Sequence, residues 1–444
     1  MNGPDRRTLS TRLVLWTQVG MHLALLGGGA WLALTGSRRA LFFLPVLPVL
    51  FAPFSYARLR LHHTLVRHLP RGRAGRVFGA VMAAIGIGCD VVLAAQLLTA
   101  RSTAAQPILE SPGVSWAGPV WYSAHVLLAL GYGVAGLVHL GVWLARRIGR
   151  PVARPQPESG LLGRREVLQR MGLVGAGLPF VVSASNVPLS YDFRTDRHDI
   201  TLPFWPLALD GLRVLHLSDI HVGGAMNRAR LRRVAELANA AAPDLVLHTG
   251  DFLTHRSGDF DAALYEALAD IRAPYGQWAC FGNHDFDNPR RLEARLRDAG
   301  VTVLRNHLVT LVVRGQPLEI GGADFLFRPP NRHRRYQEIV DGWGPRTGAP
   351  RILLNHDPSA FDALPAGCAD LVLSGHTHGG HIGVQLDVGS AVTLVGLAGI
   401  PDQGVFTRGD MHMFVTRCVG FYGYPMRLGI PPELSLLILH TPQA

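Results

Sequence analysis

The amino-acid sequence predicts an α/β fold of two packed mixed sheets flanked by helices, preceded by an all-α transmembrane region. In the first part of the 444-residue chain, long apolar runs alternate with arginine-rich linkers. From about residue 211, short apolar runs alternate with amphipathic stretches instead. A run of about 20 apolar residues can cross a bilayer, and alternation of strands and helices indicates a largely parallel sheet covered by helices.

The net charge differs between the same two parts of the chain. Residues 1–187 contain 19 Arg and five acidic residues, and residues 188–444 contain 24 Arg and 27 acidic residues. The net charge of +11 is therefore +14 in the first part and −3 in the second. A basic chain can bind nucleic acid, but here the excess arginine lies between apolar runs, where membrane topology accounts for it. No nucleic-acid partner is expected.

Residues 1–150 are expected to form a transmembrane region of about four helices. The apolar runs are 13–35, 41–57, 77–100 and 118–145, of which the second is short and contains two prolines. Arginines concentrate in the N-terminal segment, in 58–76 and in 146–170, and the positive-inside rule places these segments in the cytoplasm. We therefore expect a multi-pass protein of the cell membrane with the lipid bilayer as a partner.

A basic linker with a short apolar run, residues 151–187, decides on which side of the membrane the rest of the chain lies. If the run 171–187 crosses, residues 188–444 are extracytoplasmic, which we expect; if it does not, they are cytoplasmic. The pair Arg164–Arg165 ahead of this run resembles a twin-arginine export signal, which is read by a receptor. Paired arginines can equally be membrane anchors, and both interpretations stay open.

Four ionisable residues lie within the apolar runs, namely His22, Asp90, His125 and His139. Such residues are costly in a bilayer and are functional candidates by default. They can also pair with one another or with other groups of the helical bundle, which would make their role structural.

Residues 188–444 are expected to form one domain with its own sheets. Strands are predicted at 212–218, 244–250 and 276–282, and helices at 227–241 and 259–271. The later part is richer in strands, among them "RILLNH", "DLVLSG" and "LSLLILH". Two packed sheets with flanking helices accommodate this number of strands.

Side chains that can bind metals follow five of these strands. The strand ends read "SDIH", "TGD", "GNHD", "NH" and "GHTH". They present Asp219, His221, Asp251, Asn283, His356, His376 and His378. Because ligands bind beyond the carboxyl ends of strands in an open α/β sheet, we expect these seven side chains to lie at one site.

The types of these side chains indicate the chemistry. Imidazole and carboxylate groups without thiolates suit Zn, Fe or Mn. Seven ligands are too many for one ion but suit two divalent ions that share a carboxylate. Two ions about 3.5–4 Å apart can clamp a phosphoryl group and generate a hydroxide nucleophile. The neighbouring Gly250, Gly282 and Gly375 fit turns in which a side chain would block close approach.

The motifs "DIH", "GD", "GNHD", "NH" and "GHTH", in this order, resemble those of the calcineurin-like metallophosphoesterases. The resemblance covers about 212–441, and the closing segment is similar to that of the membrane-associated YkuE-like bacterial branch. It implies a four-layer α/β sandwich, two divalent metal ions and a hydrolase that acts on phosphate esters.

The resemblance also implies a role for each candidate residue. One ion would be bound by Asp219, His221 and His378 and the other by Asn283, His356 and His376, with Asp251 bridging. His284 would be a catalytic residue that donates a proton to the leaving oxygen or stabilises transition-state charge. His381 stands where the branch usually has Gln and could bind substrate or have an ordinary surface role. Thr254 stands where many relatives have Asp.

The expected function is therefore that of a membrane-anchored phosphoesterase with two metal ions. Its substrate would be a phosphate mono-, di- or pyrophosphate ester, and the anchoring suggests a lipid or cell-envelope compound. The alternative is a membrane sensor or transport protein in which the phosphoesterase domain is regulatory or degenerate.

Overall fold

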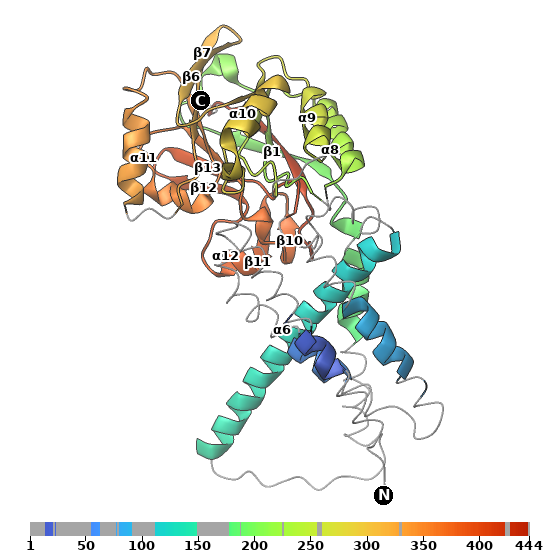
Figure 1. Cartoon of the computed structure of the whole chain (residues 1–444). Coiled ribbons are helices and arrows are strands. Elements are labelled where there is room, and N and C mark those ends of the chain that lie inside the picture. The colour runs from blue at the N-terminus through green and yellow to red at the C-terminus, as the bar shows by residue number, and fades with distance from the viewer. Residues whose placement is uncertain are drawn as a thin grey trace, which may run out of the picture. The chain divides into compact units, whose positions relative to one another are not determined.

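The chain divides into two compact units, Met1–Ser185 and Asn186–Ala444 (Figure 1). A computed structural model describes residues 14–20, 23, 55–62, 77, 80–90, 112–148, 177–186, 188–223, 226–254, 260–327, 331–421 and 427–442. The division lies two residues before the domain start expected at residue 188. The pair Arg164–Arg165, most of the run 41–57 and His22 lie outside the described residues.

The first unit is helical wherever it is described over a continuous stretch. Residues 14–20, 55–62, 80–90 and 177–186 are helical, and a long helix, α6, spans Pro112–Ile148. Within α6, Val120–Leu144 is long and apolar enough to cross a membrane, and it is the one helix of the described residues that is. The predicted run at 118–145 thus forms a single helix, whereas the other expected spans are described only in part and stay predictions.

Asp90 is buried in the first unit, and both of its carboxylate oxygens accept hydrogen bonds. Oδ2 accepts from Gln18 Nε2 at 2.9 Å and from Arg58 Nε at 3.2 Å, and Oδ1 accepts from Trp121 Nε1 at 2.8 Å. His125 Nδ1 bonds the Trp121 carbonyl at 2.8 Å. Because buried charges are tolerated when paired and hydrogen-bonded, pairing among the helices accounts for Asp90.

The second unit contains two six-stranded mixed sheets. The strands of the first, in spatial order, are β1 (Arg194–Thr201), β14 (Glu433–His440), β2 (Leu212–Leu217), β3 (Leu245–His248), β4 (Gln277–Ala279) and β5 (Val301–Val303). Strands β2 to β5 run parallel. The last strand of the chain, β14, is inserted between β1, to which it is parallel, and β2, to which it is antiparallel.

The second sheet is also mixed, but its antiparallel strands are the two edge strands. In spatial order it consists of β12 (Gly404–Arg408), β13 (Met411–Val415), β9 (Leu371–Ser374), β8 (Arg351–Asn355), β7 (Gln316–Ala323) and β6 (Leu308–Val313). The four central strands run parallel, and β12 and β6 are antiparallel to their neighbours. The parallel strands β2, β3, β4, β8 and β9 are those whose ends carry the predicted metal ligands.

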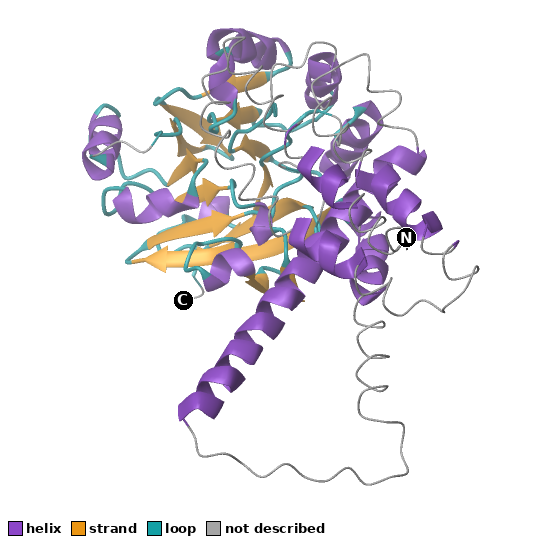
Figure 2. Cartoon of the chain, turned by 60° about the horizontal axis from the view of Figure 1, so that its bottom comes forward, coloured by secondary structure: helices purple, strands orange, loops and turns teal. Residues whose placement is uncertain are grey.

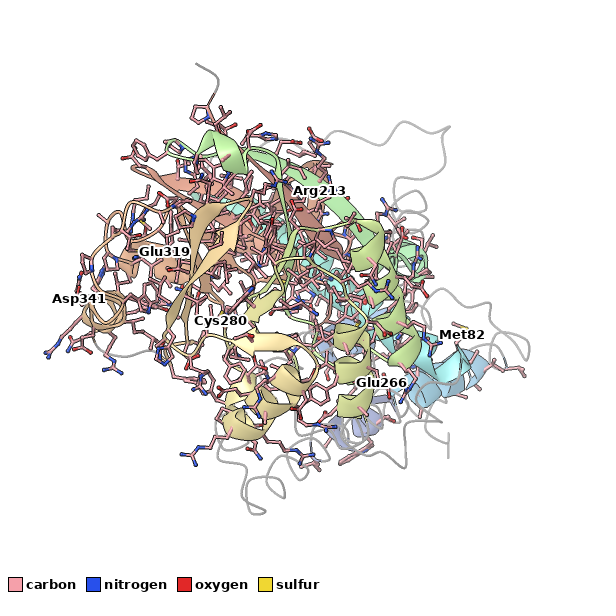
Figure 3. All side chains as sticks on the ribbon, turned by 90° about the horizontal axis from the view of Figure 1, so that it is seen from above. Met82, Arg213, Glu266, Cys280, Glu319 and Asp341 are labelled. Atoms are coloured by element: carbon pink, nitrogen blue, oxygen red, sulfur yellow. The ribbon has the colours of Figure 1, made fainter. Side chains whose placement is uncertain are left out.

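Helices α8 (Arg228–Ala240), α9 (Phe260–Ala269) and α10 (Pro289–Asp298) follow the first parallel strands. Asn227 caps α8 by accepting a hydrogen bond from Arg230 N, and Asn288 caps α10, which has proline in its first turn, so the local sequence sets both helix starts. Arg228 on α8 forms an ion pair with Glu266 on α9; Glu266 is labelled in Figure 3. A fourth helix, α11 (Arg332–Asp341), begins within the arginine-rich stretch after β7.

Side chains of the strands alternate between cores, so helices and sheets form successive layers. On β2, Leu215 belongs to the core beneath α8, α9 and α10, whereas Val214 belongs to the core between the two sheets. On β8, Ile352 belongs to the core between the sheets and Leu353 to a third core with Tyr336 of α11. Figure 2 shows the strands with helices around them. The predicted α/β fold with mixed sheets and flanking helices is confirmed.

These three cores consist of residues between 193 and 439. Among the described residues, the second unit therefore has three hydrophobic cores of its own. It also contains a small separate sheet of β10 (Gly383–Asp387) and β11 (Ser390–Thr393), followed by the short helix α12 (Leu394–Leu397).

Candidate metal centre

The structure brings all seven predicted ligands together at the carboxyl ends of five parallel strands. Asp219 follows β2, Asp251 follows β3 and Asn283 follows β4, while His356 and His376 follow β8 and β9 of the other sheet. His221 and His378 lie two residues beyond Asp219 and His376. The site is thus built from both sheets, because their strand ends open on the same space.

Asp251 lies between two groups of potential ligand atoms. Its Oδ2 is 3.5 Å from His221 Nε2 and 3.3 Å from His356 Nε2. Asp219, His221 and Asp251 are close enough to hold one cation, and so are Asp251, His356 and His376. The Asp251 carboxylate is the member that the two groups share.

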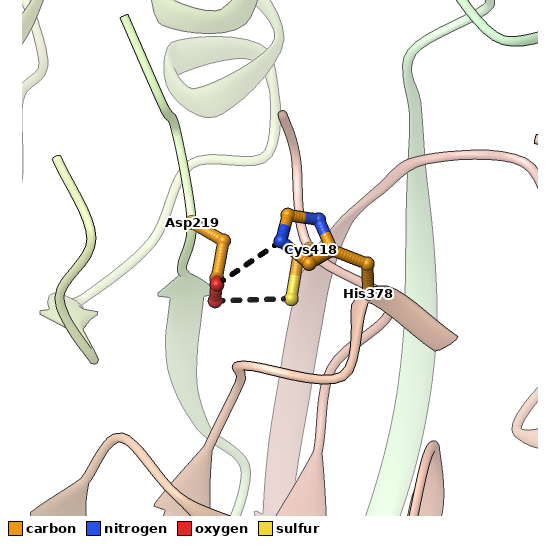
Figure 4. Close-up of side chains that lie close together, drawn as sticks. All are labelled: Asp219, His378 and Cys418. Atoms are coloured by element: carbon orange, nitrogen blue, oxygen red, sulfur yellow. Dashed lines mark hydrogen bonds and ion pairs between the residues drawn. The ribbon is translucent and has the colours of Figure 1, made fainter. Parts of the chain in front are cut away.

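The two oxygens of the buried Asp219 carboxylate have different surroundings. Oδ2 accepts hydrogen bonds from Ser218 Oγ at 2.5 Å and from the His376 backbone N–H at 2.9 Å. It also accepts one from Cys418 Sγ at 3.1 Å (Figure 4). Oδ1 is 3.3 Å from His378 Nε2 and 3.6 Å from His221 Nε2, and no hydrogen bond within the described part of the chain satisfies it. Oδ1 is therefore oriented as a metal ligand would be.

The hydrogen bonds of the histidines set which nitrogen is available. His356 Nδ1 donates to the Thr249 carbonyl at 2.7 Å, which directs Nε2 into the site, 3.1 Å from Asn283 Oδ1 and 3.1 Å from His376 Nδ1. His378 Nδ1 lies 3.3 Å from the Gly420 carbonyl and presents Nε2 to Asp219. Backbone bonds of this kind fix the tautomer of metal-binding histidines. A cation among these acceptor atoms would satisfy all of them.

The electrostatics of the site favour positive charge. Burial alone would lower the pKa of His356, but the carboxylates of Asp251 and Asp219 raise this pKa to about 10. Burial would raise the pKa of Asp219, and the neighbouring His356 and His378 instead hold it well below its usual range. Two buried carboxylates thus attract either a proton or a metal ion, as expected for a centre that binds divalent cations.

Five of the seven candidate ligands have a left-handed backbone, namely Asp219 (φ 53°), His221 (49°), Asp251 (54°), His376 (69°) and His378 (51°). Non-glycine residues adopt this region at a cost of roughly 1–3 kcal/mol each, and such residues cluster at functional sites. All three predicted glycine roles are confirmed: a Cβ on Gly250 would lie 2.1 Å from the Gly282 backbone N, one on Gly282 2.2 Å from Asp251 Oδ1, and one on Gly375 2.3 Å from Asp219 Oδ2.

His284 and His381 adjoin the ligands. The His284 backbone N–H donates to Asp251 Oδ1 at 2.7 Å, and its Nδ1 bonds the Thr254 carbonyl at 3.2 Å. Its ring centroid lies 5.1 Å from that of His221. The His381 ring lies 4.9 Å from the ring of His378. Both predicted residues are therefore placed next to the candidate metal centre.

Sequence reasoning missed two residues that hold the ligand loops. Asp285, the last residue of "GNHD", is buried and accepts backbone hydrogen bonds from Asp251 at 2.7 Å and Gly282 at 2.9 Å. Arg427, in the closing segment, is also buried and donates to the carbonyls of His378 at 3.0 Å and Gly420 at 2.6 Å. The signals that could have identified them were the "GNHD" motif for Asp285 and the closing segment for Arg427.

Cys418 was missed as well, because it lies in the closing segment and in none of the five motifs that present the candidate ligands. The residue is 199 positions from Asp219 in the sequence. Its backbone is left-handed (φ 66°), and its thiol reaches the carboxylate only because the segment after β13 crosses the end of β2.

Comparison with known proteins agrees with this geometry. Residues 212–380 match the family model described as calcineurin-like phosphoesterase. The metallophosphoesterase YkuE of Bacillus subtilis is 28% identical over 252 residues, which are 56% of this chain and 86% of YkuE. A metallophosphoesterase of Aquifex aeolicus is 30% identical over 258 residues, which are 56% of this chain and 93% of the relative. The alignment therefore covers almost the whole length of that relative.

Two further relatives have more specific names. A zebrafish (Danio rerio) transmembrane protein with metallophosphoesterase domain is 28% identical over 341 residues, covering 72% of this chain and 74% of the relative. The UDP-2,3-diacylglucosamine pyrophosphatase LpxG of Chlamydia trachomatis is 24% identical over 301 residues, covering 55% of this chain and 88% of LpxG. The resemblance seen in the motifs is confirmed, and the chain belongs to the calcineurin-like phosphoesterase family of hydrolases.

Proposed function

We propose that the second unit hydrolyses a phosphate mono-, di- or pyrophosphate ester with two divalent metal ions. The observation that carries this proposal is the position of Asp251, whose carboxylate is common to two groups of potential ligand atoms. Two cations that share a carboxylate would supply a metal-activated hydroxide and a clamp for the phosphoryl group.

In this proposal the chain's residues divide between the two ions. Asp219, His221 and His378 bind one, Asn283, His356 and His376 bind the other, and Asp251 bridges. The imidazole and carboxylate donors fit Mn, Fe or Zn. The Nδ1 bonds of His356 and His378 to backbone carbonyls support this assignment, because they direct Nε2 of each ring toward the carboxylates.

His284 is proposed as the residue that protonates the leaving oxygen. Its Nδ1 bonds the Thr254 carbonyl, which orients the ring, and Nε2 is proposed as the atom that holds the transferred proton. His284 is not assigned to either ion, so its loss should slow the reaction without removing the metals. His381, beside His378, is proposed to contact the substrate.

We further propose that the chain is anchored in the cell membrane as a multi-pass protein, with residues 188–444 on the extracytoplasmic side and a lipid or cell-envelope phosphate ester as substrate. The apolar helix Val120–Leu144 and the names of the zebrafish and chlamydial relatives support this. Protease added to intact cells should cleave the domain. Protection until the cells are lysed would place it in the cytoplasm instead.

The catalytic proposal is tested with the fragment 186–444, Mn²⁺ and bis(p-nitrophenyl) phosphate. Asp251→Asn should lose both bound metal and turnover. His284→Ala should retain metal but lower kcat by about 10²- to 10⁴-fold, the usual contribution of a general acid. His307→Ala, which changes an exposed histidine before β6, is the control and should match the wild type. Full activity of Asp251→Asn would contradict the proposal.

The alternative, a membrane sensor or transport protein with a regulatory or degenerate phosphoesterase domain, depends on ionisable residues of the first unit. Asp90, its main candidate, is accounted for by its pairing with Arg58, Gln18 and Trp121. The second unit retains every candidate ligand, which supports catalysis over degeneration.

A further inference from the structure

The small sheet that follows the candidate metal centre presents an apolar surface to solvent. This surface, the apolar hairpin, comprises β10, β11 and α12, residues 383–397, labelled in Figure 1. Six large side chains on it are 49–73% exposed, namely Val384, Leu386, Val388, Val392, Leu394 and Leu397. Clustered apolar exposure of this kind marks interaction sites on soluble domains.

The exposure is fixed by the way the hairpin is attached. Val384 pairs directly with Val392, so both lie on one face of the sheet. Thr393, the next residue, is buried, and its hydroxyl donates to the buried carboxylate of Asp402. Gly383 N bonds the Leu428 carbonyl at 3.0 Å. Because neighbouring strand residues point to opposite faces, burying the valines would expose Thr393 and break these bonds.

The composition of the hairpin identifies the chemistry of its partner. Residues 382–401 contain one charged residue, Asp387, and no arginine, in a chain that has 43. An anionic surface would be met by basic side chains, so the partner must be apolar and uncharged. A lipid bilayer is such a partner, and the helix Val120–Leu144 of the same chain is long and apolar enough to anchor the protein in one.

The hairpin is continuous with the candidate metal centre. Leu394 N donates to the Ile382 carbonyl at 3.2 Å, and Ile382 follows His381 directly. A Cβ on Gly380, between His378 and His381, would touch Thr393 and Val395. An apolar phase that covered the hairpin would therefore lie next to the histidines of the site.

We propose that the apolar hairpin docks in the hydrocarbon of a lipid bilayer and so brings the metal centre to phosphate esters held in the membrane. The docking stands on the hairpin alone, whereas its consequence for substrate rests on the proposed function. The fragment 186–444 can be tested by itself, because it is a compact unit whose three hydrophobic cores are formed by its own residues.

The test is flotation of this fragment with phosphatidylcholine vesicles at high salt, where exposed charges are screened. The wild type should float with the vesicles. Leu386→Gln/Leu397→Gln should reduce the floating fraction at least about tenfold, because burial of two leucines is lost. The control Leu207→Gln/Val312→Gln changes residues that are 79% and 71% exposed outside the hairpin, and it should float like the wild type.

A wild type that stays with the soluble protein, or equal losses in both double variants, would overturn the docking. The docking would also be overturned if the wild type formed a dimer that does not float and the hairpin substitutions converted this dimer to monomer. A second copy of the chain would then be the partner of the hairpin. Val384→Thr/Val392→Thr, which keeps β-branched side chains, repeats the test should the leucine variant fail to fold.

Hydrolysis of bis(p-nitrophenyl) phosphate separates this proposal from the proposed function. The hairpin variants should keep wild-type turnover of this soluble ester. Turnover without flotation overturns the docking alone, and flotation without turnover overturns the catalytic proposal alone. In the full chain reconstituted in vesicles, the Leu386→Gln/Leu397→Gln variant should lower kcat/KM for a lipid phosphate ester at least about tenfold and leave the soluble ester unaffected.

Discussion

The two carboxylate oxygens of Asp219 have different roles. Oδ2 is occupied by Ser218, Cys418 and the backbone of His376, while Oδ1 faces the imidazole nitrogens. Donors to the oxygen that does not bind metal fix the carboxylate and tune its affinity for the ion. Cys418 is the donor that the sequence motifs do not contain.

We expect Cys418→Ala to weaken metal binding by about 10- to 100-fold, the usual effect of removing such a donor. Cys418→Ser keeps a hydroxyl donor and should stay close to the wild type. Both replacements meet the same left-handed backbone, so strain does not distinguish them. The measurement is the Kd for Mn²⁺ by isothermal titration calorimetry, and equal values for alanine and wild type would show that the thiol does not orient Asp219.

At the scale of elements, the buried start of β14 links the two sheets. Glu433 accepts a hydrogen bond from the Arg417 backbone at 3.0 Å and forms an ion pair with its guanidinium at 2.7 Å. His198 on β1 lies 3.4 Å away. Arg417 follows β13 of the second sheet and also pairs with Asp196 of β1. Removing one partner of such a buried network leaves the others uncompensated.

Glu433 should make the domain sensitive to acid. Burial would raise its pKa, but the hydrogen bond from His198 and the charge of Arg417 lower this pKa to about 2, against a usual value of 4.5. Because the pKa of Glu433 is lower in the folded state than in the unfolded state, its ionisation stabilises the fold fully at pH values above the unfolded pKa. The stability is lost as pH falls from about 4.5 through 2, and it amounts to about 3 kcal/mol.

Urea unfolding of the fragment at pH 7 and pH 3 measures this contribution. Glu433→Gln should lower the free energy of unfolding at pH 7 by roughly 3 kcal/mol and show a smaller difference between the two pH values. Glu236→Gln, on the exposed face of α8, is the control. An unchanged pH dependence in Glu433→Gln would show that other carboxylates cause the acid sensitivity.

At the scale of the whole second unit, the candidate metal centre connects the two sheets. Asp219 and Asp251 come from one sheet and His356 and His376 from the other, and the two buried carboxylates attract a cation to the space between them. Bound metal should therefore stabilise the domain as well as activate it, because a ligand that binds only the folded state adds stability.

Removal of metal should lower the melting temperature of the fragment. At a thousandfold excess over Kd, a ligand adds about 4 kcal/mol, which corresponds to a shift of roughly 8–16 °C for a domain of this size. Differential scanning fluorimetry with EDTA, followed by excess Mn²⁺, measures the loss and its recovery. Asp251→Asn should show neither, and a wild type that EDTA does not affect would contradict a metal link between the sheets.

The sequence by itself determined the elements and the chemistry of the site. Strand and helix periods are local, which is why the strands at 212–218 and 244–250 and the helix at 227–241 could be predicted within a few residues. The candidate ligands could be predicted because each follows a recognisable strand, and the ends of parallel strands meet at one edge. Asn227 and Asn288 set the starts of α8 and α10, because each side chain accepts a hydrogen bond from a backbone N–H three residues later, and such short-range caps are encoded locally.

Only the tertiary structure decided what depends on contacts between distant segments. The insertion of β14 between β1 and β2, the thiol of Cys418 on Asp219 and the linkage of the sheets through Glu433 join residues far apart in the chain. The outward face of Val384 and Val392 depends on the anchoring of Thr393 to Asp402. Local patterns encode local conformation, whereas strand order and the facing of a sheet are set by which segments bury each other's surfaces.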